Sequence, residues 1–103
     1  MEEKNHKLIV VIVNKGDASK VVKGAKKEGA VGATVLTGRG SSIRDKAKLF
    51  GLPIEPEKEM IFIIVLEEQV EIILKKITTL VDLNAPGKGI AFVLEVEKVV
   101  GIL

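Results

Sequence analysis

The order of strand-like and helix-like segments is the feature that most constrains the fold of this chain. Four short runs rich in β-branched and aliphatic residues predict strands: 7–14, 33–40, 60–66 and 90–96. The runs "KLIVVIVN" and "MIFIIVL" are apolar on both faces, which is typical of buried central strands. Apolar residues at helical spacing lie between the first two runs and between the last two. The chain therefore reads as strand, helix, strand, long connection, strand, helix, strand.

Two amphipathic helices account for the segments between these strands. The first begins at Asp17 or Ser19, either of which can cap it, and ends at Gly29. Its apolar stripe faces the sheet and its lysines lie on the other side. The second helix spans 67–80, and its apolar stripe is formed by five residues: Val70, Ile73, Leu74, Ile77 and Leu80.

This order predicts an α+β fold, the ferredoxin-like βαββαβ sandwich, in which two helices cover one face of a four-stranded antiparallel sheet. Right-handed crossovers place the first and third strands in the centre and the second and fourth at the edges. At 103 residues the chain has room for one domain with one core, so we assign residues 1–103 to a single domain.

The connection at about 41–58 is long for so small a domain. It is polar and is interrupted by Gly51, Pro53 and Pro56, so we predict a flexible, functional loop. Within it, "SIRD" has the spacing of a capping box, and 43–50 could form a short helix.

Two glycine-rich segments with a basic residue flank the predicted sheet. Gly38, Arg39, Gly40 and Ser41 follow the second strand, and Gly87, Lys88 and Gly89 precede the fourth. Glycines allow backbone N–H groups to form an anion-binding concavity, and the basic side chain supplies the opposite charge. The second segment matches neither a Walker loop nor a dinucleotide fingerprint, because a strand follows Gly89 where those motifs require a helix.

The predicted topology places both segments at the same end of the sheet, but on opposite edges, roughly 14 Å apart. That distance is too large for one small phosphate group. We therefore predict that edge-to-edge packing of identical subunits brings "TGRGSS" of one copy to "APGKG" of the next, with the ligand between subunits.

Composition excludes several classes of site. The chain has no cysteine, and its one histidine, His6, lies in a polar N-terminal stretch without partners for metal binding or catalysis. A formal charge of +2 does not by itself imply a nucleic-acid partner. No signal peptide or apolar run of membrane-spanning length is visible, so a cytoplasmic location is expected.

The sequence resembles the PII signal-transduction family. The resemblance covers nearly the whole chain and depends on the first strand, on "EGAVGATV" and on "PGKGIAFVLEVEKVVGI", which matches the family's B-loop, last strand and C-terminal segment. The segment 41–58 occupies the T-loop position. The resemblance implies a homotrimer with adenine-nucleotide sites (ATP, ADP or AMP) in clefts between subunits. Thr34, Gly40, Gly87 and Gly89 match family binding positions, and charge adds Arg39 and Lys88 as phosphate contacts.

Several departures from the family pattern indicate a divergent PII-like member. Ile90 replaces the B-loop lysine, and Gly101 and Leu103 replace the C-terminal basic residues. The T-loop is shortened, the chain has no tyrosine to be modified, and the glutamine linked to 2-oxoglutarate binding has no counterpart. The missing cations count against ordinary ATP binding.

We therefore predict a non-enzymatic regulator that senses a small anionic metabolite and signals through the 41–58 loop. Leu49, Phe50 and Leu52 are the candidate contacts with a target protein, for example a membrane transporter or an enzyme. They could instead fold back on their own domain. The alternative is an RNA-binding ferredoxin-like module, but the first strand lacks the aromatic residues that stack bases. An acylphosphatase-like enzyme is disfavoured, since "NKGDAS" lacks the arginine that such chemistry requires.

Overall fold

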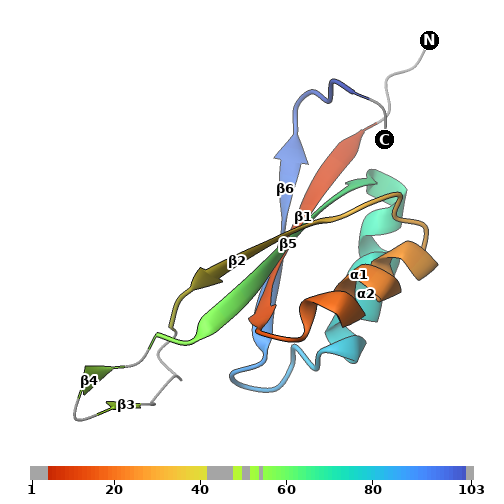
Figure 1. The fold of residues 1–103 in the computed structure, drawn as a ribbon. Coiled ribbons are helices and arrows are strands. Elements are labelled where there is room, and N and C mark those ends of the chain that lie inside the picture. Colours follow the sequence, from red (N-terminus) through yellow and green to blue (C-terminus); the bar gives the residue numbers. More distant parts are fainter. Residues whose placement is uncertain (1–4, 42–47, 50–51, 54, 102–103) are drawn as a thin grey trace.

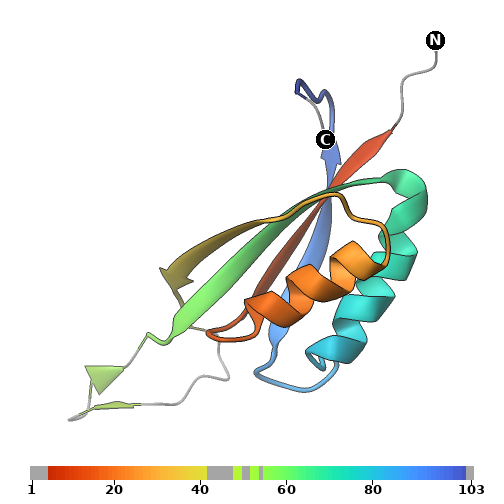
Figure 2. The ribbon, with the colours of Figure 1, turned by 45° about the vertical axis from the view of Figure 1, so that its right-hand side comes forward.

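The structure, a computed structural model, describes residues 5–41, 48–49, 52–53 and 55–101. Four strands form an antiparallel sheet in the order β2-β5-β1-β6, and both α-helices cover one face of it (Figures 1 and 2). The elements are β1 (His6–Asn14), α1 (Ala18–Lys27), β2 (Thr34–Arg39), β3 (Lys48–Leu49), β4 (Leu52–Pro53), β5 (Glu57–Leu66), the 3-10 helix η1 (Glu67–Gln69), α2 (Val70–Leu80) and β6 (Gly89–Val96). The predicted ferredoxin-like fold is confirmed.

The two central strands are β1 and β5, the first and third of the predicted four. β1 pairs antiparallel with β5 on one side and with β6 on the other, and β2 pairs with β5. This is the order that right-handed crossovers through α1 and α2 require. The edges of the sheet are therefore β2 and β6.

The core lies between the sheet and the helices. Because successive side chains of a strand alternate between faces, every second residue of β1 and β5 points at the helices. These residues pack against the apolar stripes of α1 and α2. The largest fully buried side chains are Ile9, Val11, Val13, Val21, Ile61, Ile63, Val65, Ile73 and Ile77.

The other face of the sheet carries no helix in Figure 2. Most of its side chains are also apolar, although the register also places Thr34 beside Phe62 and Lys58 beside Asn14. We call this surface the open sheet face; the register assigns to it Val10, Ile12, Leu36, Met60, Phe62, Ile90, Phe92 and Leu94. Phe62 is 37% exposed and Phe92 40% exposed, and they lie on either side of Val10. Contiguous exposed apolar surfaces are typical of sites where proteins contact a partner.

The first turn of α1 is held by a residue from a distant strand. Asp17 occupies the N-cap position, but its side chain makes no capping hydrogen bond. Glu59 of β5 instead accepts hydrogen bonds from the backbone N–H of Gly16 (2.7 Å) and Ala18 (3.1 Å). No capping hydrogen bond from Asp17 is present, and a carboxylate from a distant strand instead accepts from the N–H of the first helical residue, Ala18, and of Gly16 before it.

The long connection contains a small hairpin where a helix was expected. Lys48 pairs with Pro53 and Leu49 with Leu52, so the helix predicted over 43–50 is wrong at residues 48–49; the rest of it lies outside the described residues. Helical hydrogen bonds are local, whereas the backbone of Leu49 is paired across the hairpin. Leu49 and Leu52, two of the predicted partner contacts, therefore lie in paired strands, and Phe50 lies outside the described residues.

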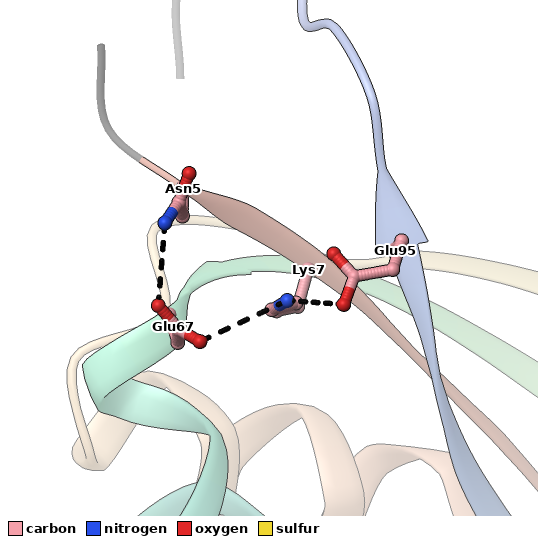
Figure 3. Close-up of polar contacts among 4 residues, drawn as sticks. All are labelled: Asn5, Lys7, Glu67 and Glu95. Atoms are coloured by element: carbon pink, nitrogen blue, oxygen red, sulfur yellow. Dashed lines mark hydrogen bonds and ion pairs between the residues drawn. The ribbon is translucent and has the colours of Figure 1, made fainter.

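At the opposite end of the sheet Lys7 joins three elements (Figure 3). Its ammonium group hydrogen-bonds to Glu95 of β6 and lies 3.9 Å from a carboxylate oxygen of Glu67 in η1. Asn5 donates a hydrogen bond of 3.4 Å to the other oxygen of Glu67. The hydrogen bond to Glu95, together with the charges of Glu95 and Glu67, raises the pKa of Lys7, and burial opposes the shift.

The raised pKa of Lys7 makes a pH-dependent contribution to stability. The folded pKa lies above the unfolded value of 10.5, so the contribution is complete below 10.5 and is lost as pH rises through the folded pKa. We expect Lys7→Met to lower the melting temperature at neutral pH, and the difference from wild type to shrink above pH 10.5. Lys75→Met removes an exposed lysine without a described ion pair and is the control. A difference for Lys7→Met that does not change with pH contradicts the assignment.

Candidate functional site

The two glycine-rich segments meet one end of the sheet, as predicted. Gly38 at the end of β2 lies opposite Lys58, and Lys58 lies opposite Asn14 at the end of β1. On the other side of β1, Val13 lies opposite Gly89, where β6 begins. The segments are therefore at the same end and on opposite edges.

A pocket of about 670 Å³ at this end reaches both segments within one chain. Its wall on the β2 side contains the predicted site residues Gly38, Arg39, Gly40 and Ser41. On the β6 side it contains Gly87 and Gly89, together with the preceding residues 83–86. The prediction from sequence places the ligand in a cleft between subunits, whereas in the structure one chain already brings both segments to one pocket. Whether a second subunit contributes stays a prediction.

Of the remaining lining residues, the sequence singles out Ile90 only as a departure from the family pattern, and Ile12, Val13, Lys58 and Met60 were not predicted. Ile12, Met60 and Ile90 contribute from the open sheet face, so part of the lining is apolar. Lys58 contributes a cation from the start of β5. No local motif marks these residues. These residues could be identified only from the antiparallel strand register, which places positions far apart in the sequence side by side.

Two predicted site residues do not line the pocket. Thr34 lies at the start of β2 opposite Phe62, farther from this end of the sheet. Lys88 is exposed between Gly87 and Gly89, both of which line the pocket. Ile90, which is 55% exposed, occupies the position where a lysine was expected from the family pattern.

The described charged side chains of the pocket are all cationic. Among its described lining residues, Arg39 and Lys58 carry charge and none is a carboxylate. Lys58 Nζ donates a hydrogen bond of 2.9 Å to Oδ1 of Asn14, an uncharged acceptor. A site with positive charge and apolar walls favours an anion that also has an apolar part.

The glycines of the second segment have separate structural roles. Gly89 has φ of +143°, and an added Cβ would lie 2.5 Å from the backbone carbonyl oxygen of Ile12. Only glycine permits this approach of β6 to β1. Gly87 has φ of +78° with open space around the Cβ position, so it is required by the turn alone.

The described part of the chain has no cluster of three His, Asp or Glu side chains able to hold a metal ion. None of the described helices is both long and apolar enough to cross a membrane.

Comparison with known proteins adds one finding. The family model described as "Nitrogen regulatory protein P-II" matches residues 6–102, from the first residue of β1 into the C-terminal segment. No curated protein matches the chain.

Proposed function

The chain belongs to the nitrogen regulatory protein P-II family and is a regulatory signalling protein, and we propose that it senses a small anionic metabolite in the pocket at the end of its sheet. The family match spans residues 6–102 and thus includes every strand and helix of the fold. The observation that carries the proposal is the single pocket shared by the two glycine-rich segments, with Arg39 and Lys58 as its charged residues.

The proposed ligand is an adenine nucleotide. Its phosphate would bind near Arg39, Lys58 and the glycine backbone, and its base would lie on the apolar side of the pocket formed by Ile12 and Ile90. Among the described lining residues the pocket offers two cations, Arg39 and Lys58, and Ile90 supplies no third one. AMP and ADP carry less charge than ATP, so we expect them to match this pocket better than ATP does.

The proposed assembly is a homotrimer, the form that proteins of this family generally adopt. The open sheet face supports this proposal because a monomer would leave Phe62, Phe92 and their apolar neighbours in contact with water. Ile12, Met60 and Ile90 belong both to this face and to the pocket. Packing of subunits on the open sheet face would therefore also enclose the ligand. The sequence-based prediction of a cleft between subunits requires such an enclosure.

Signalling is proposed to run through the 41–58 segment to a target protein, such as a transporter or an enzyme. The segment leaves the sheet beside the pocket: Arg39 pairs with Glu57, and the N–H of Gly40 donates to the carbonyl of Pro56 at 3.2 Å. A ligand that contacts Arg39 and Gly40 thus touches the base of the segment. It shifts the conformation of the segment to the extent that it binds one conformation better.

Direct binding measurements test the ligand proposal. We expect calorimetry to detect AMP and ADP, and expect Arg39→Ala and Lys58→Met each to weaken binding by about tenfold, or about 1.4 kcal/mol, the scale of one charge-assisted contact. Lys88→Ala is expected to weaken it less, because Lys88 does not line the pocket.

Lys23→Ala is the matched control, since it removes one positive charge from the exposed side of α1, away from the pocket. An equal loss of nucleotide affinity in Lys23→Ala would mean that binding depends only on the net charge of the protein. The proposal fails if none of AMP, ADP and ATP binds the wild-type protein. Tight, salt-sensitive binding of single-stranded RNA would support the alternative of a nucleic-acid module, with Phe62 and Phe92 as stacking residues.

A further inference from the structure

Asn14, the last residue of β1, connects the two sides of the pocket through one side-chain amide. Its Oδ1 accepts a hydrogen bond of 2.9 Å from Nζ of Lys58. Its Nδ2 donates a hydrogen bond of 3.0 Å to the backbone carbonyl of Gly87. Lys58 lies at the start of β5 and Gly87 lies just before β6, so the three residues form a bridge across the end of the sheet.

The chemistry of the two partners determines how the amide is oriented. A lysine ammonium can only donate, so the oxygen of Asn14 must face Lys58. A carbonyl can only accept, so the amide nitrogen must face Gly87. The two contacts therefore use opposite ends of the same planar group. Because the group is planar, a rotation of the amide moves both of its ends together.

On the Gly87 side the bridge orients a peptide of the glycine-rich segment. The carbonyl of Gly87 and the N–H of Lys88 belong to one trans peptide and point in opposite directions. Nothing lies within 4 Å of the Cβ position of Gly87, so neighbouring side chains do not confine this turn closely. The hydrogen bond from Asn14 thus sets the direction of a backbone donor next to the pocket.

On the Lys58 side the bridge reaches the base of the 41–58 segment. Gly38 pairs with Lys58 and Arg39 with the adjacent Glu57. The hydrogen bond from Gly40 to Pro56 closes the same base. A displacement of Lys58 is therefore a displacement of this base, and an anion in the pocket attracts the Lys58 ammonium group.

We propose that Asn14 is a positioning residue that couples the glycine-rich segment before β6 to the base of the 41–58 segment. The role of this coupling in sensing rests on the proposed function, but the coupling itself exists without ligand. Because coupling between two sites is reciprocal, a shift of Lys58 changes the Gly87 peptide, and a ligand that fixes the Gly87 peptide changes the position of Lys58.

A ligand-free experiment tests the coupling directly. The amide chemical shifts of Lys88 and Gly89 are measured by NMR in wild type, Lys58→Met, Asn14→Ala and the double variant. We expect Lys58→Met to move these resonances in the wild-type background, and the displacement to fall by about fivefold or more when Asn14 is alanine, as expected when a double-mutant cycle removes the connecting group. An undiminished displacement in the Asn14→Ala background overturns the proposal.

Lys15→Met is the matched control. Lys15 follows Asn14 and forms an ion pair of 3.1 Å with Glu57, which precedes Lys58, yet it makes no described contact with Gly87. Its removal breaks one exposed ion pair at the same strand end and leaves both hydrogen bonds of Asn14 in place. The Lys88 and Gly89 resonances are expected to stay in place, and movement as large as that in Lys58→Met would show that the Asn14 bridge is not the route.

Asn14→Asp separates the two halves of the bridge and also serves if Asn14→Ala fails to fold. A carboxylate still accepts from Lys58 but cannot donate to the Gly87 carbonyl. We expect Asn14→Asp to uncouple Lys58 from Lys88 as completely as alanine does. Retained coupling in this variant would contradict the role of the Gly87 hydrogen bond.

ADP then tests the functional consequence. We expect Asn14→Ala to weaken ADP binding by about fivefold, at the lower end of typical coupling factors, and Lys15→Met to leave it unchanged. Equal ADP affinity in Asn14→Ala and wild type overturns the functional part of the proposal. Failure of ADP to bind wild type counts against the proposed ligand, while the ligand-free shifts still decide whether Asn14 couples the two sides.

Discussion

Gly89→Ala is expected to lower the free energy of unfolding by about 2–5 kcal/mol. Left-handed backbone at a non-glycine residue costs about 1–2 kcal/mol, and forcing an atom into filled space costs about 1–3 kcal/mol more. The new Cβ would lie 2.5 Å from the Ile12 carbonyl oxygen and 3.1 Å from a methyl group of Val13. The carbonyl cannot retreat easily, because β1 is paired on both sides. Urea unfolding at one fixed protein concentration measures the loss.

Gly87→Ala is the matched control for this prediction. Gly87 also has a positive φ, but an added Cβ would meet nothing within 4 Å. Gly87→Ala is expected to lower the free energy of unfolding only by the cost of a positive φ at a non-glycine residue, about 1–2 kcal/mol. If the two variants lose the same stability, the close approach of β6 to Ile12 does not constrain position 89.

Phe92→Glu is expected to abolish the proposed trimer. Phe92 is 40% exposed on the open sheet face, next to Val10 in the register. In a symmetric assembly the substitution is present in every subunit, so it places several like charges in one apolar interface, where unpaired charge is strongly unfavourable. Light scattering of the purified variant should give the mass of a monomer, whereas wild type should give that of a trimer.

Ile72→Glu is the control for the assembly. Ile72 is 52% exposed, but it lies on α2, on the helical side of the sheet. The Ile72→Glu substitution should leave the mass of the assembly, measured by light scattering, unchanged. A trimer that survives Phe92→Glu would exclude the open sheet face as the interface, and dissociation of Ile72→Glu would place the interface on the helices.

Most of the fold could be predicted because its signals are local. Apolar alternation and helical spacing identify the elements, and the handedness of crossover connections then determines the strand order. The error at residues 48–49 has a physical reason. The spacing of "SIRD" and the residues after it suits a helix, but pairing of Leu49 with Leu52 in the hairpin prevails. Local propensity is a weak guide in so short a segment.

The candidate site could be predicted only in part. Gly38 to Ser41 and the two glycines at 87 and 89 were found because glycine beside a basic residue is a recognisable local pattern. Lys58 was missed because nothing in its neighbourhood marks it. The register places it between Gly38 and Asn14, so its place in the pocket depends on pairing of β5 with both β1 and β2.

The sequence by itself determined which segments are strands and helices, their order in the sheet, and the end at which the two glycine-rich segments lie. These properties follow from apolar periodicity and glycine placement, which are local features of the sequence, and from the chirality of the chain. Only the tertiary structure decided that one pocket reaches both segments, that Glu59 holds the first turn of α1, and that Asn14 joins Lys58 to Gly87. Such contacts depend on distances between side chains far apart in the sequence, and those distances exist only once strand register and packing have brought the elements together.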